Sequence, residues 1–412
     1  MRKYKLGDIA TVEISGVDKK IKDGEKEIRL CNFVDIYYNW AITTAQHDSF
    51  MLATARPNEI SKFKLKKGQV ALTKDSETRD DIGIPTYIAD DFDDAILGYH
   101  CALVTPNKDI LDGRYLNALL HTDYAKKYFA CNASGSGQRY ALSVEALNSF
   151  PVPIIPLHEQ KQIGEIFSAL DKKIELNKRI NQNLEAMAKQ LYDYWFVQFD
   201  FPDENGQPYK SSGGKMVWNE KLKREIPKGW NVAKLTDEIE LQYGFPFSTD
   251  LFTEQVTSVP VVRIRDILVN SISAYTTEEV EERYLLQKQD LLIGMDGNFH
   301  INYWTDNVSY LNQRSVRLRA KNNSNVSIVQ AKYDIQPYIK AKETRTKGST
   351  VGHLSDKDMK ELYVLVCPNE KAREKLDSIL SMIVKNRNEV TFLIKQRNEL
   401  LPLLMNGQII IE

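Results

Sequence analysis

Polar and basic side chains gather in two loops, each of which follows a short apolar stretch of similar sequence. The first loop reads TKDSETRDDIGIP (73–85) and the second GMDGNFHINYW (294–304). Amide, hydroxyl, imidazole and guanidinium groups form hydrogen bonds with the base edges and phosphates of DNA. The candidate DNA contacts in these loops are Lys74, Ser76, Thr78, Arg79, Asp296, Asn298, His300 and Asn302.

Two further segments of the second half carry the same kinds of group. LNQRSVRLRAK (311–321) places Arg317 and Arg319 on one face of an expected strand, and KAKETRTKGSTVGH (340–353) carries Lys340, Lys342 and Arg345 ahead of a Gly-Ser-Thr turn. The backbone amides of such a turn can hold a phosphate. In the first half, SGSGQR (134–139) takes the corresponding place. The candidate contacts here are Ser136, Gln138, Arg139, Asn312, Gln313, Arg314, Lys347, Ser349 and Thr350.

No motif for catalysis or for a bound cofactor accompanies these loops. SSGGKM (211–216) has Met216 where a phosphate-binding loop needs a hydroxyl, and GSGQRY (135–140) lacks the third glycine of a dinucleotide site. HEQKQ (158–162) lacks the second histidine of a zinc site. We therefore expect a protein that is not an enzyme and binds neither a metal nor a cofactor. The alternative is a catalytic centre assembled from distant residues.

The surrounding sequence repeats in the same order in both halves of the chain. LKKGQVALTKD (65–75) is answered by LLQKQDLLIGMD (285–296), and Asp35-Ile36-x-x-Asn39 by Asp266-Ile267-x-x-Asn270. GQRYALSVEALNSFPVPIIP (137–156) is answered by STVGHLSDKDMKELYVLVCP (349–368). Repeated order across such distances indicates two copies of one unit, so each loop has a counterpart. Taken singly, each loop has a second interpretation as plain solvated chain; the repetition favours DNA.

Each copy is followed by a segment with the spacing of a long coiled-coil helix. Apolar residues alternate three and four apart, as in a heptad seam. Each helix would have about 40 residues and span roughly 60 Å. The seam residues are Phe167, Leu170, Ile174, Leu184 and Leu191 in the first helix and Ile379, Ile383, Val390, Leu393 and Leu400 in the second, with Asn177, Asn181, Asn386 and Arg397 at polar seam positions. We expect the two helices to pair; the alternative is that each packs on its own domain.

Connectivity predicts the direction of the pair. Residues 201–230 between the first helix and the second copy are rich in Gly, Pro and Ser, which break helices. The second copy then folds at the far end of the first helix, and its own helix runs back, so the pair is antiparallel. The aromatic residues Tyr192, Tyr194, Trp195, Phe196, Phe199 and Phe201 exceed the needs of one seam. They either cap the coiled coil against the second copy or hold a partner protein.

Composition and length fit a soluble protein of two or three domains, and the pattern of short strands and helices within each unit is α+β. The 412 residues are 42% hydrophobic and 27% charged, with a net charge of −1. No apolar run is long enough for a membrane helix, and MRKYKLGDIA has no apolar region behind its charges. The four cysteines are scattered, as expected of reduced thiols in the cytoplasm. The short strands are expected at 28–33, 69–72, 99–104, 261–264, 290–293 and 315–318, with helices near 113–129 and 327–338.

The central region resembles the specificity subunit of type I restriction-modification systems. The resemblance rests on FPVPIIPLHEQKQIGEIFSALDKKIELNK (150–178) and LYDYWFVQFDFPDENGQPYKSSGGKMVWNEKLKREIPKGW (191–230), and on LNQRS and GSTVGHLSDKDMK in the second half. It implies two target recognition domains, each reading half of a split target in double-stranded DNA, separated by two long helices that form an antiparallel coiled coil. The first domain has no element like LNQR, so the two half-sites should differ.

The resemblance also implies the domain order and the partners. The domains would be recognition domain 1 (1–156), the first long helix (157–200), a connector (201–230), recognition domain 2 (231–368) and the second long helix (369–406). The chain would dock two methyltransferase subunits, which bind S-adenosylmethionine, and two motor and nuclease subunits, which use ATP and Mg²⁺. The helical pair would fix the spacing of the half-sites, about one turn or roughly 34 Å apart. The rival functions are a self-contained DNA-modifying enzyme and a coiled-coil adaptor that binds protein only.

Overall fold

The computed structural model describes residues 2–137, 139–256, 258–346, 352–405 and 407–408. The chain forms two compact units. The first comprises Met1–Glu175 with Phe392–Glu412, and the second Leu176–Thr391. Each unit therefore contains one part of each long helix in addition to its own sheets.

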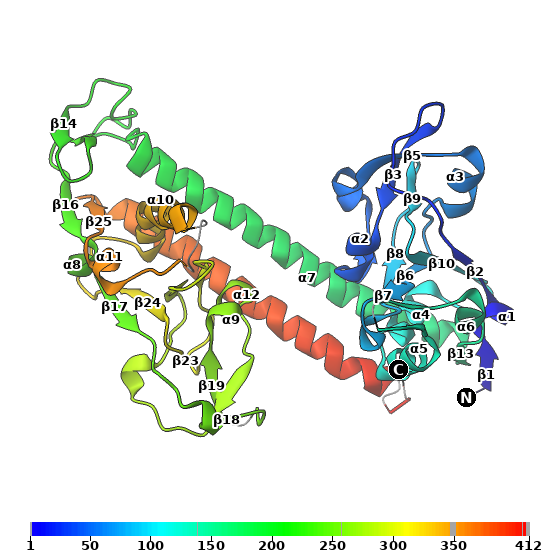
Figure 1. Cartoon of the computed structure of the whole chain (residues 1–412). Helices are drawn as coiled ribbons and strands as arrows, with labels where there is room; N and C mark the ends of the chain where they lie inside the picture. Colours follow the sequence, from blue (N-terminus) through cyan, green and yellow to red (C-terminus); the bar gives the residue numbers. More distant parts are fainter. Residues whose placement is uncertain (1, 138, 257, 347–351, 406, 409–412) are drawn as a thin grey trace. The chain divides into compact units, whose positions relative to one another are not determined.

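The first unit is built on a five-stranded sheet of order β2-β10-β6-β8-β4 (Figure 1). A second sheet of order β5-β3-β9 packs beside it, and its apolar residues share one core with β6 and β10. The strands of these sheets are β2 (Ala10–Ile14), β3 (Lys26–Cys31), β4 (Ala41–Ile42), β5 (Met51–Ala55), β6 (Val70–Thr73), β8 (Pro85–Ile88), β9 (Ala95–Leu97) and β10 (Cys101–Pro106).

Short helices and a hairpin complete the first unit. The helices include α1 (Leu6–Ile9), α2 (Phe33–Tyr37), α3 (Pro57–Phe63), α4 (Gly113–Leu120), α5 (Asp123–Asn132) and α6 (Val144–Asn148). The hairpin β11 (Ser134–Ser136) and β12 (Arg139–Ala141) pairs with β7 (Asp75–Ser76), and β1 (Arg2–Lys5) pairs with β13 (Pro151–Ile154). The single helix expected near 113–129 is two helices, because the Thr122 hydroxyl accepts a hydrogen bond from Ala125 N (3.3 Å) and starts α5 there.

The second unit has a four-stranded sheet of order β17-β24-β21-β22 and another of order β18-β20-β19-β23. Their strands are β17 (Ile239–Tyr243), β18 (Phe252–Thr253), β19 (Val259–Val262), β20 (Ala274–Thr276), β21 (Leu291–Gly294), β22 (Ile301–Tyr303), β23 (Tyr310–Leu311) and β24 (Ser315–Ala320). The pairs β14 (Met216–Asn219) with β15 (Arg224–Pro227), and β16 (Asn231–Lys234) with β25 (Tyr363–Val366), are added to these. Its shorter helices are α8 (Leu235–Glu238), α9 (Ile264–Val269), α10 (Ile328–Thr346) and α11 (Asp356–Lys360).

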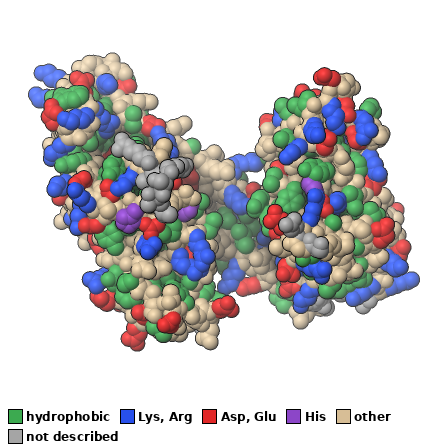
Figure 2. Space-filling model, in the orientation of Figure 1, with side chains coloured by type: hydrophobic (Ala, Val, Ile, Leu, Met, Phe, Trp, Pro, Cys, Tyr) green, Lys and Arg blue, Asp and Glu red, His purple; other side chains and the backbone are tan. Residues whose placement is uncertain are grey.

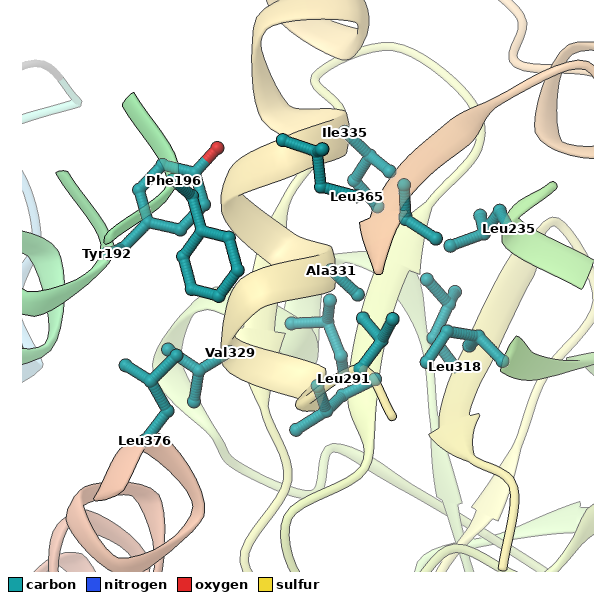
Figure 3. Close-up of a cluster of buried hydrophobic side chains, with 14 of the residues drawn as sticks. Tyr192, Phe196, Leu235, Leu291, Leu318, Val329, Ala331, Ile335, Leu365 and Leu376 are labelled. Carbon is teal, nitrogen blue, oxygen red and sulfur yellow. The ribbon is translucent and has the colours of Figure 1, made fainter. Parts of the chain in front are cut away.

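Helix α10 forms the centre of the core of the second unit. Figure 3 shows Ala331 and Ile335 of α10 directed toward strand residues such as Leu365, and Val329 directed toward Leu376. All five are almost fully buried. Removing such side chains from water is the main source of stability for a helix of this length, because isolated helices are marginal.

The two units repeat each other at the level of single hydrogen bonds. Lys74 N donates to His100 O (2.9 Å) in the first unit, and Met295 N donates to Arg314 O (2.9 Å) in the second. Leu142 N donates to Lys74 O, and Leu354 N to Met295 O, both at 2.8 Å. The predicted repeat is confirmed: residues that correspond in sequence occupy the same places in the two backbones.

The long helices are α7 (Leu157–Tyr192), extended by a π-helical turn (Asp193–Val197), and α12 (Glu370–Met405). In the first unit the beginning of α7, with Phe167, shares a core with the end of α12, with Leu404. In the second unit the end of α7, with Leu184, shares a core with the beginning of α12, with Ile383. The two helices therefore run antiparallel, as the connectivity of the sequence predicts.

The ten predicted seam residues are all at least partly shielded from solvent. Phe167, Ile174, Leu184, Ile379, Ile383 and Leu393 are buried, and Leu170, Leu191, Val390 and Leu400 are partly buried. Of the six aromatic residues at and just beyond the end of α7, five are buried in the same core cluster as Trp230, and Tyr194 is exposed. Their burial supports the interpretation that they close this end of the helical pair.

Candidate nucleic-acid interface

The first unit has a cavity of about 600 Å³ at the end of β6. It is lined by Asp75 and the loop after it, by Tyr37 and Tyr38 of the α2 segment, and by His100 and Arg139. Tyr38 is 75% exposed, and the Tyr37 hydroxyl donates to Asp81 (2.8 Å). Exposed aromatic rings beside cationic groups are suited to contact with nucleotides.

Asp75 is the buried group around which this site is organised. Its carboxylate accepts hydrogen bonds from Lys74 Nζ (2.9 Å), Arg139 Nη2 (3.0 Å) and the ring of His100. Burial opposes ionisation, but the hydrogen bonds from His100, Lys74 and Arg139 outweigh it and lower the pKa of Asp75. The ionised carboxylate therefore holds three cationic or polar groups at the rim of the cavity.

The other predicted contacts of this loop lie around the same rim. Ser76 pairs with Tyr140 across β7 and β12, and the guanidinium of Arg79 lies over the Tyr140 ring, 5.0 Å from its centroid. Thr78 and Arg79 are exposed. The structure thus brings Arg139 to the loop that carries Lys74, Ser76, Thr78 and Arg79, although Arg139 is about 60 residues away in sequence.

The second unit has the corresponding cavity of about 410 Å³. Its described lining contains Arg263, Arg265 and Arg314, together with His300 and amide side chains, and includes no acidic residue. Asn298, Asn312 and Gln313 supply the amides. The composition is cationic and rich in hydrogen-bond groups, as a surface for DNA requires. Figure 2 shows histidine side chains among basic ones on the visible face of each unit.

Asp296 is the last residue of the repeated stretch LLQKQDLLIGMD (285–296), as Asp75 is the last residue of LKKGQVALTKD (65–75) in the first unit. Arg314 Nη1 donates to it at 3.1 Å, and Nδ1 of His353 lies 2.6 Å from its other oxygen. The carboxylate is largely buried, whereas Arg314 and His353 are exposed. The residues Asp75, His100, Arg263, Arg265 and His353 were not among the predicted contacts. Asp75 and Asp296 occupy the same position at the end of the two repeated stretches. This shared position is the signal that could have identified Asp75.

Some predicted groups have structural partners. The Asn302 amide donates to the carbonyls of Ile267 and Leu268 (3.0 Å each), and its oxygen accepts from Arg387. The side chain of Arg317 is almost fully buried and pairs with Glu240, and Arg319 pairs with Asp290 at 2.7 Å. Arg317 therefore faces the protein interior, contrary to the expectation that its side chain is available to contact DNA.

Several predicted contacts lie outside the described residues. These are Gln138, Lys347, Ser349, Thr350 and the side chains of Ser136 and Arg345. In the part of the chain that is described, no cluster of three or more His, Cys, Asp or Glu side chains has the arrangement of a metal site. Among the described helices, none combines the length and the hydropathy needed to cross a membrane.

Comparison with known proteins gives a consistent family. The family model described as "Type I restriction modification DNA specificity domain" matches residues 1–186 and 227–400. A curated relative from Methanocaldococcus jannaschii, the type I restriction enzyme MjaIX specificity subunit, is 25% identical over 318 residues, which cover 74% of this chain and 71% of that protein. The Escherichia coli type I restriction enzyme EcoBI specificity subunit is 27% identical over 168 residues, which cover 38% of this chain and 34% of that protein.

A solved structure supports the fold. The crystal structure of the S subunit of a type I restriction-modification system from M. genitalium aligns with a TM-score of 0.57 at 15% identity. The alignment covers 98% of this chain and 95% of that chain. The likeness therefore extends over both units and both long helices, and at this identity it concerns the fold alone.

Proposed function

The chain belongs to the family of type I restriction modification DNA specificity domains, and on that basis we propose that it is the subunit that selects the DNA target of a type I restriction-modification complex. Each unit reads one half of a bipartite sequence in double-stranded DNA. The subunit is not catalytic itself, and it scaffolds the subunits that methylate and restrict. The complex acts in the cytoplasm.

The observation that carries the proposal is the pair of equivalent cavities at the ends of β6 and β21. Each lies beside an aspartate, buried in the first unit and largely buried in the second, that holds an exposed arginine, and each has hydrogen-bond donors at its rim. The two cavities differ in composition, since aromatic rings and acidic groups line the first and arginines and amides the second. Different linings support recognition of two different half-sites.

The chain and its partner subunits have different roles in the proposed complex. The proposed complex has two methyltransferase subunits and two motor and nuclease subunits, and these partners supply the S-adenosylmethionine, ATP and Mg²⁺ sites. The long helices α7 and α12 would set the spacing between the half-sites and provide docking surface for the methyltransferase subunits. Two linked recognition units gain affinity because the second contact becomes intramolecular.

The test is to co-express the chain with its methyltransferase subunit and to map methylated adenines across the host genome by single-molecule sequencing. We expect one split motif, with two short blocks around a fixed gap, that appears only when this chain is present. A complex that purifies intact and yields no motif would instead support the second candidate, a coiled-coil adaptor that binds protein only.

A further inference from the structure

The buried aspartates of the two units each bind one arginine and one histidine, but in exchanged places. In the first unit the residue just before strand β10 is His100, and the arginine, Arg139, comes from the β12 hairpin. In the second unit the residue just before β24 is Arg314, and the histidine, His353, comes from the segment that bridges to Asp296.

Backbone geometry shows that His100 and Arg314 occupy equivalent positions, whereas Arg139 and His353 come from corresponding segments two residues apart. His100 and Arg314 both adopt the left-handed conformation, with φ of 70° and 63°. Most residues avoid this region, and in both units the strained residue is not glycine but one whose side-chain nitrogen contacts the aspartate. On the other side, His353 bridges to Asp296 at the place that Ala141 takes opposite Asp75, and Arg139 lies two residues before Ala141.

Each arginine has an exposed side chain and binds its aspartate through one terminal nitrogen. The side chains of Arg139 and Arg314 are 59% and 70% exposed, while those of Asp75 and Asp296 are 8% and 18% exposed. Arg314 uses one terminal nitrogen on Asp296, and a guanidinium has five N–H donors in a planar fork. A carboxylate bound at one edge of the guanidinium fixes the plane of the group and leaves its other edge for a bidentate partner.

We propose that Arg139 and Arg314 each read a guanine in the half-site of their own unit, with Asp75 and Asp296 as the positioning residues. Guanine presents O6 and N7 as a pair of acceptors in the major groove, and arginine bonds to both. The inference rests on the proposed function and names the base that each unit reads at one position. Because the arginines come from different elements, the two guanines take different places in their half-sites.

The test uses the complex of this chain with its methyltransferase subunit and the same genome-wide methylation readout. Arg314→Lys and Arg139→Lys keep the charge but remove the fork. We expect each to reduce the preference for guanine at one position of one half-site by roughly 5- to 150-fold, the discrimination of one bidentate contact, and to leave the other half-site unchanged. Asp296→Asn and Asp75→Asn should relax the same positions as the corresponding lysine variants.

Matched controls separate this role from a general charge effect. Arg283→Lys and Arg56→Lys change exposed arginines that pair with Glu281 and Glu59 in the second and first unit, and both should leave the motif unchanged. Arg314→Gly suits the left-handed backbone, so a loss of guanine preference in this variant cannot be attributed to misfolding.

The outcomes are distinct. A wild-type complex without any split motif overturns the proposed function. A wild-type motif that Arg314→Lys and Arg139→Lys leave unaltered overturns the guanine assignment alone. Weaker methylation at every site with no change in base preference also overturns it, because that is the behaviour of a phosphate contact.

Discussion

The side-chain amide of Asn386 in α12 donates a hydrogen bond to the main-chain carbonyl of Asn177 in α7, at 3.0 Å and across 209 positions of sequence. Asn177 and its neighbour Asn181 are both buried in the helical pair. Nδ2 of Asn177 and Oδ1 of Asn181 have no hydrogen-bond partner among the described residues. Polar residues in a coiled-coil seam commonly fix register at a cost in stability.

This arrangement predicts that Asn177→Leu stabilises the protein. The substitution removes a buried amide donor without a partner and leaves the main-chain carbonyl in place for Asn386, so we expect the free energy of unfolding to rise by about 1 kcal/mol. Urea denaturation of the purified chain measures it. Asn386→Ala, which removes the bonded partner, is the control and should destabilise the protein; a decrease for both variants would contradict the interpretation.

The burial of Arg317 yields a second prediction. Burial lowers the pKa of this guanidinium, which donates to Glu240 and to the Arg283 carbonyl (3.3 Å) and has an unsatisfied Nε. Replacing a buried ion by an apolar side chain of similar volume is often neutral, so Arg317→Met should change stability by less than about 1 kcal/mol. It should leave the methylated motif unchanged.

The contrast variant for Arg317 is Glu240→Ala. It leaves the buried guanidinium without its carboxylate, and since Glu240 is half-exposed we expect a loss of about 1–2 kcal/mol. Thermal denaturation and motif mapping of both variants test whether Arg317 has a structural role or contacts DNA. A changed motif in Arg317→Met with unchanged stability would place Arg317 in DNA recognition after all.

Sequence patterns sufficed for the architecture because local signals and the repeat agree with it. All six expected strands occur within two residues of their predicted bounds, as for 290–293 and β21 (Leu291–Gly294). The paired sequence blocks correspond in the backbone: Tyr4 pairs with Val152 in the first unit, and Ala233 with Val364 in the second. Heptad spacing predicted the long helices because no other arrangement buries an apolar stripe of that length.

The interface was less predictable because it depends on which polar groups become buried. Asp75 and Arg139 are 64 residues apart and meet only when β12 pairs with β7. Arg317 alternates with apolar residues as a surface residue would, yet both faces of β24 are covered. Asn302 belongs to a polar loop by composition, but its amide holds the end of α9. These outcomes follow from tertiary contacts that no local pattern encodes.

The helical pair should act as a ruler between half-sites. Deleting residues 175–181 from α7 and 389–395 from α12 shortens both helices by one heptad and retains Asn388 and its contact with Thr305 O. The pair becomes about 10 Å shorter. We expect the gap in the methylated motif to shrink, by up to roughly three base pairs at 3.4 Å each, with both blocks of bases retained. A motif with the original gap would contradict the ruler.

Buried Asp334 of α10 predicts how stability depends on pH. Burial raises its pKa from 3.8 to about 6, although the carboxylate accepts from the Tyr192 hydroxyl (2.8 Å) and from Gln330 Nε2 (3.2 Å). The folded state therefore holds this proton at pH values where the unfolded chain has released it. The contribution is fully present below pH 3.8 and is lost as the pH rises through about 6, which corresponds to about 3 kcal/mol.

Asp334→Asn, which cannot ionise, isolates that contribution. The unfolding free energy of the wild type, relative to this variant, should fall between about pH 4 and pH 6 and be flat above.

Asp358 provides the opposite case. Burial opposes ionisation of its carboxyl group, but the hydrogen bonds from Lys342 and Ser355 outweigh burial and hold the pKa of that carboxyl well below its usual range. Relative to Asp358→Asn, the wild type should gain stability as the pH rises through the acid range. Urea denaturation from pH 2 to pH 8 measures both, and parallel curves for the wild type and Asp334→Asn would show that Asp334 ionises as it does in the unfolded chain.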